Sequence, residues 1–279
     1  MHEEPILQVK NLRKQFGTGC TECREIENRT LEKNFCKQCG TVYACQDISF
    51  DLYQGEILGI VGESGSGKST MMQCLYFDEE VTSGEAYIST PELAGSNVFE
   101  LSSQQKRSIR NHVYGMVYQN PIHGLKMNFS SIGNIAEKLI AAGNRNVSAM
   151  AAVSKRLLES VHIPLHRMKE EPKNFSGGMQ QRVQIAKALS NNPPILFLDE
   201  VTTGLDLSVQ ANVLDLIKYI QRDLGISMIV VSHDLAVIRM LADRTIVLLN
   251  GKIIEEGLTD QVLEDPQHEY SQQLVYSLL

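Results

Sequence analysis

A glycine-rich octapeptide that directly follows an apolar run constrains this chain more than any other feature. The octapeptide, Gly62-Glu63-Ser64-Gly65-Ser66-Gly67-Lys68-Ser69, fits the pattern G-x4-G-K-[ST], and a helix-like segment begins at Thr70. In this pattern the glycines let backbone amides point inward at an anion, and the helix N-terminus adds the positive end of its dipole. The lysine reaches the β- and γ-phosphates, and the serine hydroxyl completes a Mg²⁺ shell. Residues 62–70 therefore predict a site for a nucleoside triphosphate and Mg²⁺.

Three short apolar runs, at residues 57–61, 195–198 and 228–231, have the composition of strands buried on both faces. Between the last two runs, apolar residues recur at helical spacing over 209–224. Buried strands that alternate with amphipathic helices indicate βαβ units and a parallel sheet. The pattern predicts an α/β fold, with a helical insert at about 122–182, where no such run occurs.

Composition narrows the class of protein further. The 279 residues include 43% hydrophobic and 21% charged side chains, an ordinary globular balance. With 26 basic against 33 acidic side chains the net charge is −7, which argues against nucleic acid as a partner. No apolar run approaches the roughly 20 residues that span a bilayer, and the first residues do not resemble a signal peptide. We expect a soluble cytoplasmic protein without direct membrane insertion.

Two adjacent carboxylates, Asp199 and Glu200, end the second buried run. The carboxyl ends of strands in an open parallel sheet face the ligand crevice. There Asp199 can hold Mg²⁺ through water, and Glu200 can orient or deprotonate an attacking water. The alternative is a solvated acidic strand end, which the upstream octapeptide disfavours.

Further motifs give the chain a resemblance to the ATP-binding cassette (ABC) ATPases. Residues 175–182, Phe-Ser-Gly-Gly-Met-Gln-Gln-Arg, look like the family's signature, in which a serine and glycines open a helix. The remaining matches are Gln119 at the Q-loop position, Thr203-Gly204-Leu205-Asp206 at the D-loop, His233 as the switch histidine and Phe16 as the adenine-stacking aromatic. Their order and spacing agree along nearly the whole chain, except at residues 17–40.

The resemblance implies one ABC ATPase domain over residues 1–279. Its fold is that of a P-loop NTPase, with a mixed or parallel RecA-like core sheet, an N-terminal antiparallel β subdomain, the helical insert and a C-terminal helical tail at about 258–279. One departure is Val201, where the family usually has a proline after the catalytic glutamate. The loss of proline affects the stiffness of this turn more than its chemistry.

The resemblance also implies a homodimer in which two cassettes lie head to tail around two Mg-ATP. Each ATP then lies between the phosphate loop of one copy and the signature of the other, and hydrolysis lets the copies part.

The implied catalytic residues are Glu200, His233 and Gln119. Mg²⁺ is implied to bind at Ser69, Gln119 and Asp199. The resemblance implies that ATP contacts the octapeptide and Thr70. It implies further ATP contacts at Phe16, Gln119, Ser176, Gly177, Gly178, Asp199 and Asp206. A non-hydrolytic clamp is the competing class, and the presence of Glu200 and His233 favours an ATPase.

Four segments bear on the branch of the family. Residues 265–272 and the run 178–182 resemble oligopeptide-importer subunits, whereas residues 118–126 and 133–139 depart from them. The latter are similar to the ATPase component of the bacterial carbon–phosphorus lyase system, which processes phosphonates. We therefore expect a soluble carbon–phosphorus lyase core as the partner, with a membrane permease of the oligopeptide, dipeptide or nickel type as the alternative.

The insertion at residues 17–40 carries a second candidate site. Cys20, Cys23, Cys36 and Cys39 form a C-x2-C-x12-C-x2-C array, the spacing of a structural Zn²⁺ site. The insertion is too short and polar to bury a core, so a metal can supply its folding free energy. An iron site of similar spacing stays open, although few aromatics and many charges favour zinc. Because Phe16 directly precedes the insertion, we hypothesise a partner-docking knob close to the adenine site.

Overall fold

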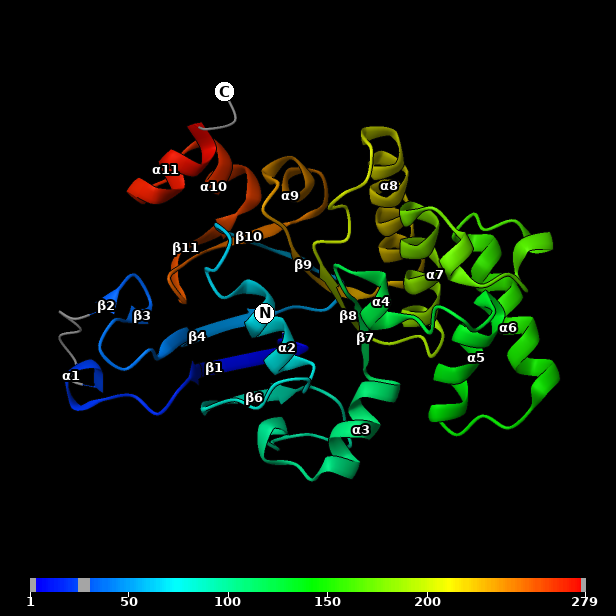
Figure 1. Ribbon diagram of the computed structural model, residues 1–279, viewed down its shortest axis with the longest axis horizontal. Helices are drawn as coiled ribbons and strands as arrows, with labels where there is room; N and C mark the ends of the chain where they lie inside the picture. The colour runs from blue at the N-terminus through cyan, green and yellow to red at the C-terminus, as the bar shows by residue number, and fades with distance from the viewer. Residues whose placement is uncertain (1–3, 25–30, 277–279) are drawn as a thin grey trace. The chain divides into compact units, whose positions relative to one another are not determined.

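A long antiparallel strand pair begins the structure, a computed structural model that describes residues 4–24 and 31–276. β1 (Leu7–Phe16) pairs with β4 (Val42–Leu52) along its whole length and with β6 (Ser83–Ile88) on its other side. Two short strands, β2 (Leu31–Glu32) and β3 (Phe35–Cys36), extend the sheet, so its order is β2-β3-β4-β1-β6 (Figure 1). This sheet confirms the expected N-terminal antiparallel β subdomain.

The chain divides into two compact units, Met1–Leu101 with Val231–Leu279, and Ser102–Val230. The prediction of one domain over the whole length stays a prediction. Besides the antiparallel sheet, the first unit has β5 (Ile57–Val61) parallel to β10 (Arg244–Leu249), which pairs antiparallel with β11 (Lys252–Leu258). β5 is buried at every residue, as its apolar run predicts.

The helices of the first unit are short. They are α1 (Thr21–Arg24), α2 (Lys68–Leu75), the 3₁₀ turn η1 (Val98–Glu100), α9 (Leu235–Leu241), α10 (Thr259–Glu264) and α11 (Glu269–Tyr276). α10 and α11 form the helical tail expected from about residue 258. α2 begins at Lys68, so the last two residues of the octapeptide already belong to this helix.

The second unit combines buried strands with most of the long helices. Its strands are β7 (Tyr114–Val117), β8 (Ile195–Asp199), parallel to β7, and β9 (Ser227–Val231), beside β8. Its helices are α3 (Ser103–His112), α4 (Pro121–Gly124), α5 (Ser131–Ala141), α6 (Val147–Ser160), η2 (Leu165–Arg167), η3 (Pro172–Asn174), α7 (Gly177–Leu189) and α8 (Leu207–Leu224). Residues 122–182, all of which are described, contain helices and turns without a strand, as predicted.

None of the described helices combines the length and the apolar composition needed to cross a membrane.

Candidate functional site

The octapeptide forms a loop that only glycine permits at two positions. Gly62 and Gly67 have φ values of 152° and 105°. A Cβ at Gly62 would collide with the carbonyl oxygen of Leu248, and one at Gly67 with that of Ala44. Backbone therefore packs directly on backbone on both sides of the loop, which fixes its path between β5 and α2.

Lys68 is the first residue of α2, and its side chain reaches back to the beginning of the loop. Its Nζ donates hydrogen bonds to the carbonyl oxygens of Gly62 (2.8 Å) and Glu63 (2.9 Å), and the residue is buried. Ser66 is buried too, and its Oγ has no hydrogen-bond partner within the described residues. Ser69 and Thr70 stand in the first turn of α2. The loop thus presents an ammonium, an unsatisfied hydroxyl and a helix N-terminus together, the groups that bind phosphate oxygens.

Two contacts of Glu63 tie the loop to distant parts of the first unit. The Glu63 amide donates to the hydroxyl of Tyr270 in α11 at 2.8 Å, and its carboxylate lies 3.1 Å from Nζ of Lys33 in the β2–β3 turn. The sequence alone does not predict either contact, because Lys33 and Tyr270 lie far from Glu63 along the chain.

Phe16 and His233 also belong to the first unit. Phe16 ends β1 with 42% of its surface exposed, and the ammonium of Lys14 lies 4.7 Å from its ring centroid. His233 is exposed and follows Ser232, whose amide donates to the carbonyl of Ile60 at 3.1 Å. That bond holds the segment of His233 beside β5, at Ile60, which precedes the first residue of the phosphate loop by two positions.

The carboxylate pair lies in the second unit with Gln119. Asp199 is the buried last residue of β8. Glu200 has a φ of 45°, a left-handed conformation that is rare for residues other than glycine and often found at active sites. Its Oε2 accepts hydrogen bonds from Gln119 Nε2 (2.9 Å) and Thr203 Oγ1 (3.2 Å). The buried Val201 occupies the position where proline was expected.

The signature forms the beginning of α7, as predicted. Ser176 is the N-cap residue, and its side chain accepts from the amide of Met179. A Cβ at Gly178 would collide with the side chain of Val209, so this glycine, which follows Gly177, also allows α7 to approach α8 closely. α7 supports the Q-loop as well, because the side-chain amide of Gln181 donates to the carbonyl of Gln119 at 2.9 Å.

Asp206 has a structural role that the sequence analysis did not assign to it. Its carboxylate caps α8 by accepting from Val209 N (3.0 Å) and Ser208 Oγ (2.8 Å), and these bonds lower its pKa. A capping aspartate at a helix start is readable in sequence, and here the family motif coincides with it.

The four cysteines of the array come together as predicted. Their Sγ atoms all lie within 4.8 Å of one another, with Cys20–Cys23 at 3.5 Å, Cys20–Cys36 at 3.9 Å and Cys23–Cys39 at 3.6 Å. Four sulfurs at 2.3 Å from a tetrahedral Zn²⁺ would be about 3.8 Å apart, so the spacing fits this metal.

Residues next to the array support its sulfurs. The Tyr43 hydroxyl donates to Cys23 Sγ at 3.2 Å, and hydrogen bonding with Thr41 lowers the pKa of Cys39 to about 6. Both effects favour thiolate, the form that binds metal. The other two cysteines, Cys45 and Cys74, are fully buried, as expected for small apolar side chains.

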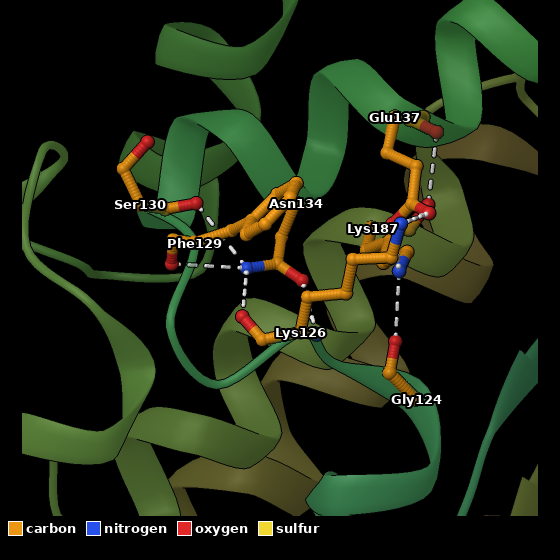
Figure 2. Close-up of polar contacts among 8 residues, drawn as sticks. Gly124, Lys126, Phe129, Ser130, Asn134, Glu137 and Lys187 are labelled. Atoms are coloured by element: carbon orange, nitrogen blue, oxygen red, sulfur yellow. Dashed lines mark hydrogen bonds and ion pairs between the residues drawn. The ribbon is translucent and has the colours of Figure 1, made fainter.

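A polar network holds the segment that follows the Q-loop (Figure 2). The buried side chain of Asn134 donates to the carbonyls of Lys126 (3.0 Å), Phe129 (3.3 Å) and Ser130 (3.2 Å), and accepts from the Lys126 amide. Lys187 of α7 donates to the Gly124 carbonyl (2.9 Å) and pairs with Glu137 of α5, which also pairs with Lys126. Residues 121–130 are therefore fixed against α5 and α7.

Comparisons with known proteins identify the class. The family profile of the ABC transporter matches residues 45–203, and TM-scores of 0.75 relate the chain to solved ATP-binding cassettes. The chain belongs to this family and is an ABC ATPase, with the P-loop NTPase fold that its motifs imply.

Among individual relatives, the chain is 44% identical to the putative phosphonates utilization ATP-binding protein PhnK of Escherichia coli, over 99% of this chain and 98% of that protein. It is 36% identical to the oligopeptide transport ATP-binding protein OppD of Bacillus subtilis, over 91% of this chain and 72% of that one. A dimeric post-hydrolysis structure of the cassette MJ0796 bound to ADP and Pi is 28% identical, with 91% and 98% of the two chains covered.

Proposed function

We propose that the chain binds and hydrolyses Mg-ATP through the residues that its motifs mark. Residues 62–70 bind the phosphates, Phe16 stacks on the adenine, and Ser69, Gln119 and Asp199 surround Mg²⁺. Glu200 activates the attacking water, and His233 contacts the γ-phosphate. The observation that carries this proposal is the phosphate loop, in which glycine backbone packing surrounds the buried Lys68.

We further propose a head-to-tail homodimer in which Ser176, Gly177, Gly178 and Asp206 of one copy contact the ATP of the other. The exposed N-terminus of α7 supports this arrangement, because its amides suit an anion. The Glu200→Gln variant with Mg-ATP tests it, since blocked hydrolysis should trap the dimer in light scattering. A strict monomer under these conditions, alone and with its partner complex, would refute the dimer.

We infer that the dimer drives a conformational change in a phosphonate carbon–phosphorus lyase complex. The identity to PhnK over nearly the full length of both chains supports this partner. Residues 121–130 provide a surface for it, because the network of Asn134 and Lys187 fixes them while Ile122 and Phe129 remain 61% and 51% exposed. The second candidate is an importer subunit, supported by the identity to OppD.

Affinity purification from native cells separates the two partners. Co-purified soluble subunits of phosphonate metabolism support the lyase, and integral membrane subunits support the importer. Phe129→Asp should abolish co-purification while ATP turnover of the isolated protein persists. The exposed Tyr219 of α8 gives a matched control, Tyr219→Asp, which should leave co-purification intact.

We also propose that Cys20, Cys23, Cys36 and Cys39 hold one structural Zn²⁺. The mutual spacing of the four sulfurs supports it. Elemental analysis should find one zinc per wild-type chain and none in Cys36→Ser, whereas Cys45→Ala, which changes a buried cysteine outside the array, should keep it. Iron in place of zinc, or zinc retained in Cys36→Ser, would contradict the assignment.

A further inference from the structure

The cysteine insertion continues the sheet that carries Phe16. In β3, Phe35 is the direct partner of Val42 in β4, and on the other side of β4 the same Val42 is the partner of Phe16. Directly opposed residues of antiparallel strands point to the same face of a sheet. Phe35, Val42 and Phe16 therefore form one row across three adjacent strands.

Both aromatic side chains of this row are accessible. Phe35 is 41% and Phe16 is 42% exposed, whereas Val42 between them is half-buried. Neighbouring strands lie about 4.8 Å apart, so the backbones at the two phenylalanines are separated by about 10 Å. A flat base in contact with a ring on each side needs about 7 Å between the ring planes. If each ring lies about one to two ångströms closer to the other than its backbone does, the two rings leave a slot of about this width above Val42.

The insertion is anchored on both sides of this slot. Cys36 follows Phe35 directly, is fully buried and belongs to the cysteine cluster, so strand alternation directs Phe35 to the opposite face. On the side of the phosphate loop, Lys33 in the β2–β3 turn lies 3.1 Å from Glu63. The hairpin that carries Phe35 thus joins the cysteine cluster to the loop that would bind the phosphates.

We propose that Phe35 is a second base-contacting residue, so that the adenine of ATP lies between the rings of Phe16 and Phe35. The metal in the cysteine cluster holds β3 in place, and ATP affinity consequently depends on metal loading. The insertion then completes the nucleotide site of its own chain, in addition to any contact with a partner. This inference rests on the proposed function, because it requires both ATP and the metal.

The experiment distinguishes protein contacts with the base from protein contacts with the phosphates. Zinc-loaded protein is titrated with a non-hydrolysable ATP analogue and, separately, with inorganic tripolyphosphate, which lacks a base. Loss of one base–aromatic stack should weaken analogue binding about tenfold and leave tripolyphosphate binding unchanged. We expect this result for Phe35→Ala and Phe35→Leu, while Phe35→Tyr and the control Tyr219→Ala, at an exposed residue of α8, bind as wild type does.

Phe35→Leu keeps an apolar side chain in β3, and elemental analysis confirms its zinc content, so loss of the metal is measured independently. Removal of zinc from the wild type should weaken analogue binding to the same extent, and should add little to the effect of Phe35→Leu.

Three results would overturn the inference. If zinc-loaded Phe35→Leu binds the analogue as wild type does while Phe16→Ala does not, Phe35 makes no base contact and the proposed ATPase stands. If Phe35→Leu weakens tripolyphosphate equally, the effect arises from the phosphate loop. If the zinc-free wild type keeps full affinity, the metal does not position Phe35. Failure of the wild type to bind either probe would instead refute the proposed function itself.

Discussion

The side-chain amide of Gln119 donates a 2.9 Å hydrogen bond to the carboxylate of Glu200. The bond joins the segment after β7 to the segment after β8, two parallel neighbours in the sheet. Since the same carboxylate oxygen also accepts from Thr203, the side chain of Glu200 is oriented by two partners on separate segments.

Glu200→Gln should lower ATP turnover by at least about 100-fold and leave ATP binding nearly unchanged, because the amide cannot accept the proton of water. Phosphate release measured beside nucleotide binding checks this. Glu92→Gln changes an exposed glutamate on the surface of the first unit and should have no effect. Turnover in Glu200→Gln equal to that of the wild type would rule out Glu200 as the base.

Gly67→Ala should destabilise the protein by at least about 2 kcal/mol and abolish ATP binding, because its Cβ would meet the backbone at Ala44 in a left-handed conformation. Gly65 also has a positive φ, of 83°, but an added Cβ there has open space. Gly65→Ala should therefore cost only about 1 kcal/mol. Denaturant unfolding compares the two, and equal losses would show that packing around Gly67 is not decisive.

Asn134→Ala should lower the free energy of unfolding by about 1–3 kcal/mol, since the Lys126 amide loses its acceptor and the carbonyls of Lys126, Phe129 and Ser130 each lose the donor that the buried side chain provides. The exposed Asn212→Ala is the matched control and should change it by less than about 0.5 kcal/mol. We expect Asn134→Ala also to weaken co-purification of the partner complex. If Asn134→Ala has the same free energy of unfolding in urea as the wild type, the network in Figure 2 does not hold residues 121–130.

Lys138 should give the stability of the protein a pH dependence above neutrality. Burial, helped by Arg110 and Lys187, lowers the pKa of Lys138 to about 8, below its value of about 10.4 in the unfolded chain. Between these values the unfolded state binds more protons, so the free energy of unfolding rises with pH. Relative to Lys138→Met, the wild type should gain on the order of 2 kcal/mol from pH 7.5 to 10.5. Urea unfolding at each pH measures this rise in the free energy of unfolding. Lys155→Met, which alters an exposed lysine, should show the same rise as the wild type.

Local sequence was sufficient to predict those parts of this protein whose chemistry depends on residues close together in the chain. The phosphate loop between β5 and α2, the capped beginning of α7 at Ser176 and the clustering of the cysteine pairs all follow from spacing. Each uses backbone conformation or ligand geometry set within a few residues, so composition and order carry the information. The buried strands were readable for the same reason, because their apolar runs are continuous.

Only the tertiary structure decided which distant groups meet. The Tyr270 hydroxyl at the Glu63 amide, the Gln119–Glu200 bond and the row of Phe35, Val42 and Phe16 join residues that no local pattern relates. Such pairs depend on strand register and helix packing, which are set by the burial of the whole core. The sequence therefore determined which residues this chain offers to a nucleotide and which cysteines it offers to a metal. The fold determined that the cysteine insertion lies in the same sheet as the aromatic residue expected to contact the base.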